Sequence, residues 1–139
     1  MSFRLTCNNT KCHSRQRAKN IVDLISNYVG SDHFFKCPEC SHNMHIEKSF
    51  NLQESGRTWK PYLRGIVELG IAGHSYRPFI FLVSRRANNR ISSCWFSYYK
   101  DLRSSGGKLK LGYGPGGPPN LRINQIKKMV KGLKQMNIY

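Results

Sequence analysis

Four of the five cysteines stand in two short motifs near the start of the chain, Cys7-x4-Cys12 and Cys37-x2-Cys40. Short spacings of this kind let a turn bring both sulfurs of a pair to one tetrahedral metal ion. We therefore predict a structural Zn²⁺ site with Cys7, Cys12, Cys37 and Cys40 as its ligands. A closed shell of four thiolates leaves no position for a substrate, so the metal would hold the fold and the function would reside elsewhere.

Two disulfides are the alternative interpretation of these cysteines. Residues 1–30 lack the apolar core and the small-residue cleavage site of a secretory signal, which favours a reducing, cytoplasmic location and hence metal binding. The nearby His13, His42 and His45 are expected to be polar surface or to support the ligands. The fifth cysteine, Cys94, lies in a strand-like run and is expected to be a small buried apolar residue.

The formal net charge is +16, and the excess lies in the second part of the chain. Residues 1–55 contain seven Lys or Arg against five Asp or Glu, whereas residues 56–139 contain sixteen against two. Four thiolates and one Zn²⁺ would bring the net charge of the first part from +2 to about zero. So positive a surface repels itself unless a polyanion neutralises it, and nucleic acid is the commonest intracellular polyanion. No run of eighteen apolar residues occurs, so we expect no membrane span.

The length of 139 residues suits one compact unit built from two parts. We predict a zinc module at 1–50 and a basic body at 51–139, co-folded, with the polar segment 51–56 as their junction. Between the two cysteine motifs, Ser14 could cap a helix whose apolar residues recur at helical spacing, and Gly30 could end it. This helix would cover the metal site and pack on the sheet.

Beyond the junction, the pattern is typical of strands. Segments 62–69, 79–83 and 91–99 are rich in apolar residues, and segment 108–113 alternates between basic or small residues and apolar ones. The segment 85–90 would be a hairpin loop between the second and third of these strands, and it carries three arginines. We expect a small, mainly antiparallel sheet with one basic face.

The last part of the chain predicts a loop and a helix. Glycines and prolines exclude a helix or a central strand at 112–119. Asn120 could cap a final helix whose apolar stripe packs on the sheet, with lysines on the remaining face. The stripe consists of Ile123, Ile126, Val130, Leu133 and Met136. The predicted fold class is α+β: a four-cysteine zinc module joined to a small mainly antiparallel sheet, closed by a C-terminal amphipathic helix.

Candidate nucleic-acid contacts are of two kinds. On a strand, Trp95 and Tyr99 point away from Cys94, Phe96 and Tyr98, and if the latter set forms the core, the first two rings could stack unpaired bases. Alternatively, both rings pack under the last helix. The other candidates are cations that few acids balance: Arg77, Arg85, Arg86, Arg90, Arg103, Lys108 and Lys110.

Catalysis finds little support in the sequence. Of seven carboxylates, only Glu68 and Asp101 lie beyond residue 55, too few for the acidic cluster of a two-metal nuclease. The glycine-proline segment is not followed by the Gly-Lys-Ser/Thr of a phosphate-binding loop. We expect no enzyme.

Over residues 5–48, the two cysteine motifs resemble those of zinc-ribbon and related four-cysteine modules in transcription factors, topoisomerase tails and small phage activators. This resemblance implies a metal site that braces a nucleic-acid-binding surface. The helix expected between the motifs departs from a plain ribbon, which would place strands there. The remaining two thirds of the chain carry no further resemblance.

Three functions fit these observations. The first is nucleic-acid binding without catalysis, with DNA favoured over RNA and single strands favoured if Trp95 or Tyr99 stacks bases, in a regulator or a sensing subunit of a larger assembly. The second is a structural RNA-binding component of a ribonucleoprotein. The third is an adaptor for an acidic protein partner. The sequence leaves the oligomeric state open.

Overall fold

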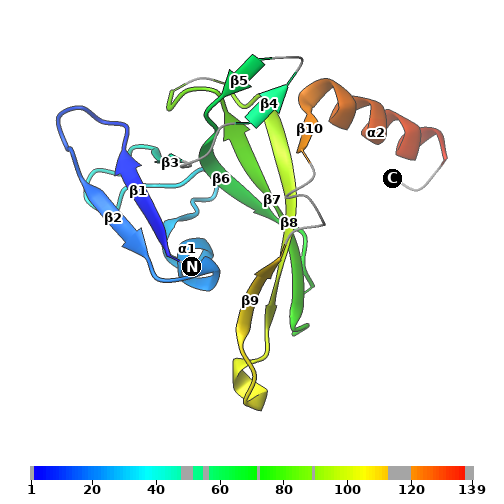
Figure 1. The fold of residues 1–139 in the computed structure, drawn as a ribbon, viewed down its shortest axis with the longest axis horizontal. Helices are drawn as coiled ribbons and strands as arrows, with labels where there is room; N and C mark the ends of the chain where they lie inside the picture. Colours follow the sequence, from blue (N-terminus) through cyan, green and yellow to red (C-terminus); the bar gives the residue numbers. More distant parts are fainter. Residues whose placement is uncertain are drawn as a thin grey trace.

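The computed structural model describes residues 2–47, 52–54, 57–71, 73–88, 90–112 and 120–136. The fold is α+β, as predicted, and most of its strands form one mostly antiparallel sheet (Figure 1). Its elements are β1 (Phe3–Cys7), β2 (Arg15–Ala18), α1 (Ile21–Tyr28), β3 (Met44–Glu47), β4 (Leu52–Glu54), β5 (Arg57–Trp59), β6 (Tyr62–Glu68), β7 (Tyr76–Ser84), β8 (Ser93–Asp101), the 3₁₀ turn η1 (Arg103–Ser105), β9 (Leu109–Gly112), β10 (Asn120–Arg122) and α2 (Ile123–Gln135).

The main sheet has eight strands, in the order β10-β8-β7-β6-β3-β1-β2, with β9 also paired to β8. The strands predicted at 62–69, 79–83, 91–99 and 108–113 are confirmed as β6, β7, β8 and β9. β4 and β5 form a separate two-stranded sheet at the predicted junction. The predicted glycine-proline loop lies mostly outside the described residues, since 113–119 are not among them.

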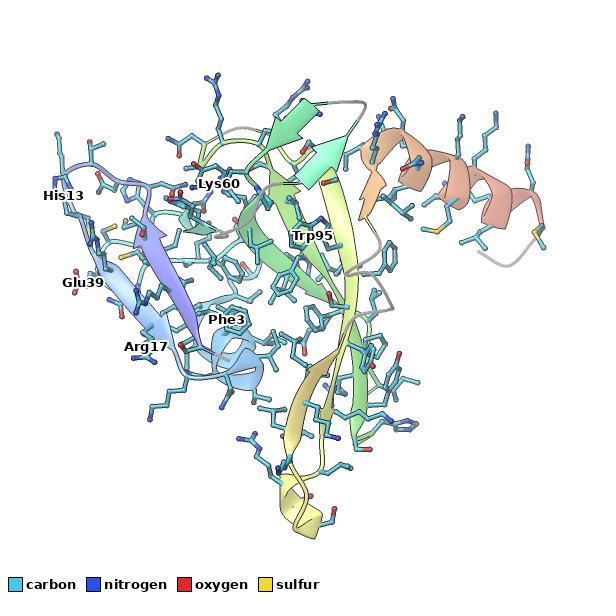
Figure 2. All side chains as sticks on the ribbon, viewed as in Figure 1. Phe3, His13, Arg17, Glu39, Lys60 and Trp95 are labelled. Atoms are coloured by element: carbon cyan, nitrogen blue, oxygen red, sulfur yellow. The ribbon has the colours of Figure 1, made fainter. Side chains whose placement is uncertain are left out.

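The inner face of β7 and β8 forms the centre of the core. Phe81 pairs with Trp95 across the two strands, and the Phe81 ring lies 6.5 Å from the ring of Phe3 in β1. Trp95 is only 1% exposed and Tyr99 is 7% exposed. Figure 2 shows Trp95 in the interior of the molecule, on the side of β8 that faces the amino-terminal module.

The prediction that the rings of Trp95 and Tyr99 are accessible for stacking on bases is therefore wrong. Period-two alternation places Trp95 and Tyr99 on the core side of β8, whereas Phe96 and Tyr98 on the other side are only partly buried. The physical reason is volume: the two large rings fill the space between β8 and the packed amino-terminal strands, so they cannot stack bases in this fold.

The segment between the cysteine motifs is a strand followed by a helix, not the continuous helix predicted from Ser14. β1 and β2 form a hairpin in which Thr6 pairs with Arg15. The helix α1 starts only after Asn20, whose side chain accepts a hydrogen bond from the Asp23 N–H at 2.9 Å. The hairpin overrides the helical pattern of 14–18 because it supplies backbone partners for these residues and buries Ala18.

The amino-terminal module and the body share one sheet across the predicted boundary at 50. Strand β3 pairs with β6, through Ile46 and Leu63. A second contact lies beside it, where the Ile66 N–H donates to the His33 carbonyl at 2.9 Å and the Phe35 N–H donates to the Arg64 carbonyl at 2.9 Å. Gly65 lies between these bonds, and a Cβ there would stand 2.1 Å from the His33 oxygen.

The last helix does not pack on the sheet. Asn120 lies in β10 and does not cap it; α2 begins after Arg122, whose N–H donates to the Gln125 Oε1 at 2.8 Å. No residue of α2 is buried, and Figure 1 shows the helix projecting beside β10. The inner face that the helix was expected to cover is occupied instead by α1 and the β1–β2 hairpin, whose apolar residues join the same core.

We expect Gly65→Ala to destabilise the protein by about 1–3 kcal/mol, because its methyl group would meet a backbone oxygen that cannot move without breaking the Ile66 hydrogen bond. Equilibrium denaturation would measure this. The matched control is Gly132→Ala in α2, where nothing lies within 4 Å of the added methyl group and helix propensity predicts a gain of up to about 1 kcal/mol. Equal effects of the two substitutions would contradict the close approach at Gly65.

Candidate metal centre and cationic groove

The four predicted cysteine ligands converge on one point. The sulfurs of Cys7, Cys12, Cys37 and Cys40 all lie within 4.8 Å of one another. The Cys7 and Cys40 sulfurs are 3.4 Å apart, and the Cys12 and Cys37 sulfurs are 3.9 Å apart. A tetrahedral ion about 2.3 Å from each sulfur separates sulfurs by about 3.8 Å, so the cluster fits a metal ion bound by four thiolates.

All five cysteines are free thiols, so the two-disulfide alternative is not the state of this structure. In the part of the chain that the structure describes, the metal-binding group contains no histidine. His13 and His42 are exposed, and His45 hydrogen-bonds to the Asn8 side chain. Cys94 is buried in β8, as predicted.

Three of the four sulfurs accept a hydrogen bond from a backbone N–H group. In each case this group belongs to the residue two positions after the cysteine. The Asn9 N–H donates to the Cys7 sulfur at 3.4 Å, and the N–H groups of Ser14 and His42 do the same for Cys12 and Cys40. His13 and Ser41, which directly follow those last two cysteines, take positive φ values of 54° and 65°. This uncommon conformation turns the following N–H toward the sulfur and stabilises a thiolate.

The environment of the cluster separates the thiol pKa values. Burial raises the pKa of the Cys7 thiol to about 12, whereas the hydrogen bond from the His42 N–H lowers the pKa of the Cys40 thiol to about 6. Four such sulfurs in contact cannot all ionise without a cation, because their charges repel. A divalent ion that replaces the protons would resolve this repulsion and hold both turns together.

The first cysteine turn also holds the arginine-rich loop between β7 and β8. Asn8, next to Cys7, donates from its side-chain Nδ2 to the Ala87 carbonyl at 2.9 Å. Its Oδ1 contacts the ring Nδ1 of His45 in β3. One amide therefore connects the cysteine cluster to the loop that carries Arg85, Arg86 and Arg90.

The structure divides the predicted cations into two groups at opposite ends of β7 and β8. Because β7 and β8 are antiparallel and Tyr76 pairs with Lys100, the start of β7 lies beside the end of β8, which in turn pairs with the start of β9. One group follows the other end of β7 and comprises Arg85, Arg86 and Arg90. The second group lies at the β9 end and comprises Arg77, Arg103, Lys108 and Lys110.

The first group contributes to a cationic groove of about 820 Å³ on the surface. Four cations line it: Arg85 and Arg90 from the loop, Arg122 at the end of β10 and Lys127 from α2. The described residues that line this groove include no carboxylate. Strand β10 pairs with β8 through Arg122 and Ser93, which places the start of α2 beside the loop.

The second group is partly neutralised by acids. Arg103 forms a bidentate contact with Asp101, with both nitrogens 2.9 Å from the carboxylate oxygens, and Arg77 lies 3.9 Å from Glu68. The pKa of Asp101 is lowered by the Arg103 side chain. Of the two ends, the cationic groove is the better candidate for binding a polyanion.

Sequence reasoning did not single out Arg122 and Lys127, two cations that line the groove. Lys127 belongs to the polar face of the predicted helix, and only the pairing of β10 with β8 brings it to the loop. It also missed the buried Arg64 and its neighbour Asn8. A signal existed for Arg64, because an arginine that follows Leu63 and precedes Gly65, Ile66 and Val67 in a strand is unusual.

Comparison of the chain with protein-family models, with curated proteins and with solved structures found no match. The four-cysteine cluster is compatible with a metal-binding module. Within the described ranges, no helix has the length and apolarity needed to cross a membrane.

We expect the chain to bind one Co²⁺ ion with the absorption bands of tetrahedral thiolate coordination, because all four sulfurs face one point. Cys37→Ser should remove one thiolate and shift or abolish these bands. Cys94→Ser is the matched control, since this buried cysteine lies outside the cluster, and it should leave the spectrum unchanged. Octahedral Co²⁺ in the unmodified protein would contradict the site.

Proposed function

We propose that this protein is a zinc-stabilised nucleic-acid-binding protein without catalytic activity, and that its ligand is DNA. The observation that carries the proposal is the cationic groove, where four Arg and Lys side chains converge and no carboxylate is among the described lining residues. The resemblance of the cysteine motifs to those of DNA-binding modules favours DNA over RNA. A regulator or a sensing subunit in a reducing compartment would have these properties.

The proposed mechanism is contact with the phosphate backbone. Clustered guanidinium and ammonium groups bind phosphates and release counterions from the nucleic acid, which makes the affinity strongly salt-dependent. The buried positions of Trp95 and Tyr99 remove the aromatic basis for preferring single strands. We therefore expect little sequence preference, because phosphate contacts carry no base information.

The proposed role of zinc is to position the arginine loop. Four-thiolate tetrahedral sites in proteins hold Zn²⁺ or iron, and Zn²⁺ is the usual structural ion. The Asn8 side chain joins the first cysteine turn to the Ala87 carbonyl within the loop. Loss of the metal would release this turn and with it one support of the groove.

We expect Arg90→Gln and Lys127→Gln each to weaken DNA binding and to reduce the slope of log affinity against log salt by about one, because each removes one phosphate contact. Anisotropy titrations across a salt series would measure both quantities. Arg103→Gln is the matched control, since it removes an equal charge that already pairs with Asp101 at the other end of the sheet. An equal loss for all three variants would leave only unspecific attraction to a polycation.

A second candidate function is an adaptor for an acidic protein, and the helix α2 favours it. Along this helix Met129 is 42% exposed, and Met136 just beyond it is 67% exposed. Ile126 and Val130 line a shallow groove of about 360 Å³ together with Lys127, Lys131 and Lys134. An apolar strip flanked by lysines suits a partner whose apolar groove has an acidic rim.

The two candidate functions differ in their response to a polyanionic peptide. If phosphate contacts dominate, polyglutamate of equal charge should displace labelled DNA only weakly, because carboxylates on a flexible chain do not reproduce the phosphate geometry. If the protein is an adaptor, polyglutamate should compete about as well as DNA does, and Met129→Gln should weaken binding of the acidic partner without affecting binding of DNA.

A further inference from the structure

A polar hollow of about 500 Å³ lies between the cysteine turns and the arginine-rich loop. Four separate segments form its wall: the end of β1, the turn before β3, strand β6 and the loop between β7 and β8. The described residues lining it include no acid and are Asn8, Ser41, His42, Asn43, Arg64 and Asn88. This polar hollow is distinct from the cationic groove, and Asn88 is the one residue that the two share among their described lining residues.

A buried guanidinium belongs to the wall of the polar hollow. Arg64 is only 4% exposed, with its guanidinium carbon 5.7 Å from the centre of the Phe34 ring. Its Nη1 lies 3.5 Å from the Ser84 hydroxyl oxygen. A cation held in so little water attracts an anion more strongly than an exposed one does.

The other side chains of the polar hollow present donors. Asn43 Oδ1 accepts a hydrogen bond from the Lys36 ammonium at 2.6 Å, which leaves the Asn43 NH₂ group without a partner among the described residues. Both polar atoms of the Asn8 amide are engaged, with Ala87 and His45. The Asn43 amide therefore offers N–H donors to a ligand in the polar hollow.

We propose that the polar hollow binds one phosphoryl group, whose free oxygens accept hydrogen bonds from the Arg64 guanidinium and the Asn43 amide. Charge-assisted hydrogen bonds from several directions are the usual means of holding such an oxyanion. Since Asn88 borders both cavities, a strand lying in the cationic groove would bring a phosphate to the polar hollow. Only the source of the phosphoryl group rests on the proposed function. If the protein binds DNA, the phosphoryl group comes either from the end of a DNA strand or from its backbone.

The test variant is Asn43→Asp. It keeps the acceptor for Lys36 but replaces the NH₂ donor by a negatively charged oxygen that repels a phosphate. Asn20→Asp is the matched control, because it adds the same charge away from the polar hollow and aspartate caps a helix as well as asparagine does. Arg64→Gln removes the guanidinium itself, and its Co²⁺ spectrum would show whether this buried variant folds.

The first experiment titrates inorganic phosphate into the zinc-loaded protein and follows the backbone amide resonances of Ser41 and His42, which line the polar hollow and not the cationic groove. We expect saturable shifts in the unmodified protein and in Asn20→Asp, with affinity at least about tenfold lower in Asn43→Asp. Absent shifts, or equal affinities in all three proteins, would overturn the proposal.

The second experiment identifies the source with one short DNA strand carrying a 5′-phosphate, a 3′-phosphate or neither. Recognition of an end predicts that Asn43→Asp abolishes a preference for one phosphorylated form. Recognition of the backbone predicts equal weakening for all three strands and a salt slope smaller by about one.

These results separate the two proposals. If Asn43→Asp changes neither phosphate binding nor strand affinity while the variants in the cationic groove do weaken binding, the polar hollow is no phosphate site and the proposed function stands. If no strand binds but inorganic phosphate does, the proposed function fails and the site serves a small phosphate-bearing molecule.

Discussion

The convergence of four thiols at one point is the constraint on which the rest of the structure depends. The sulfurs lie where the turn between β1 and β2 meets the turn before β3. Two contacts connect these turns to the rest of the protein. Strand β3 pairs with β6 and continues the sheet into the body, and Asn8 holds the loop between β7 and β8.

A second consequence concerns the core. The hairpin and α1 are held against the inner face of β7 and β8, where Phe3 meets Phe81 and the buried ring of Trp95 completes the packing. The close approach of His33 to Gly65 fixes the distance between the two parts, since no side chain fits there. Because these elements cover the inner face of β7 and β8, α2 does not pack there. It projects beside β10 and places Lys127 near the loop arginines.

Charge follows the same architecture. Asp101 and Glu68 balance part of the positive charge at the β9 end. The described residues that line the cationic groove include four cations and no carboxylate. Arg64, buried between the cysteine turns and the loop, extends this positive region inward. A phosphate polymer lying along the cationic groove and entering the polar hollow would relieve the repulsion at both places.

Local spacing and composition were sufficient to predict the two cysteine motifs that form the cluster, the strands β6 to β9 and the arginine-rich loop, because each motif, strand or loop is a short stretch of the chain. Pairing across long separations decided the rest. The pattern at 14–18 is compatible with a helix, but pairing with β1 makes it a strand. The alternation in β8 assigns Trp95 and Phe96 to opposite faces, yet only packing against Phe81 and its neighbours decides which face is buried. The cationic groove and the polar hollow unite residues from segments far apart in sequence, and no local pattern could have brought Lys127 to Arg90 or Asn43 to Arg64.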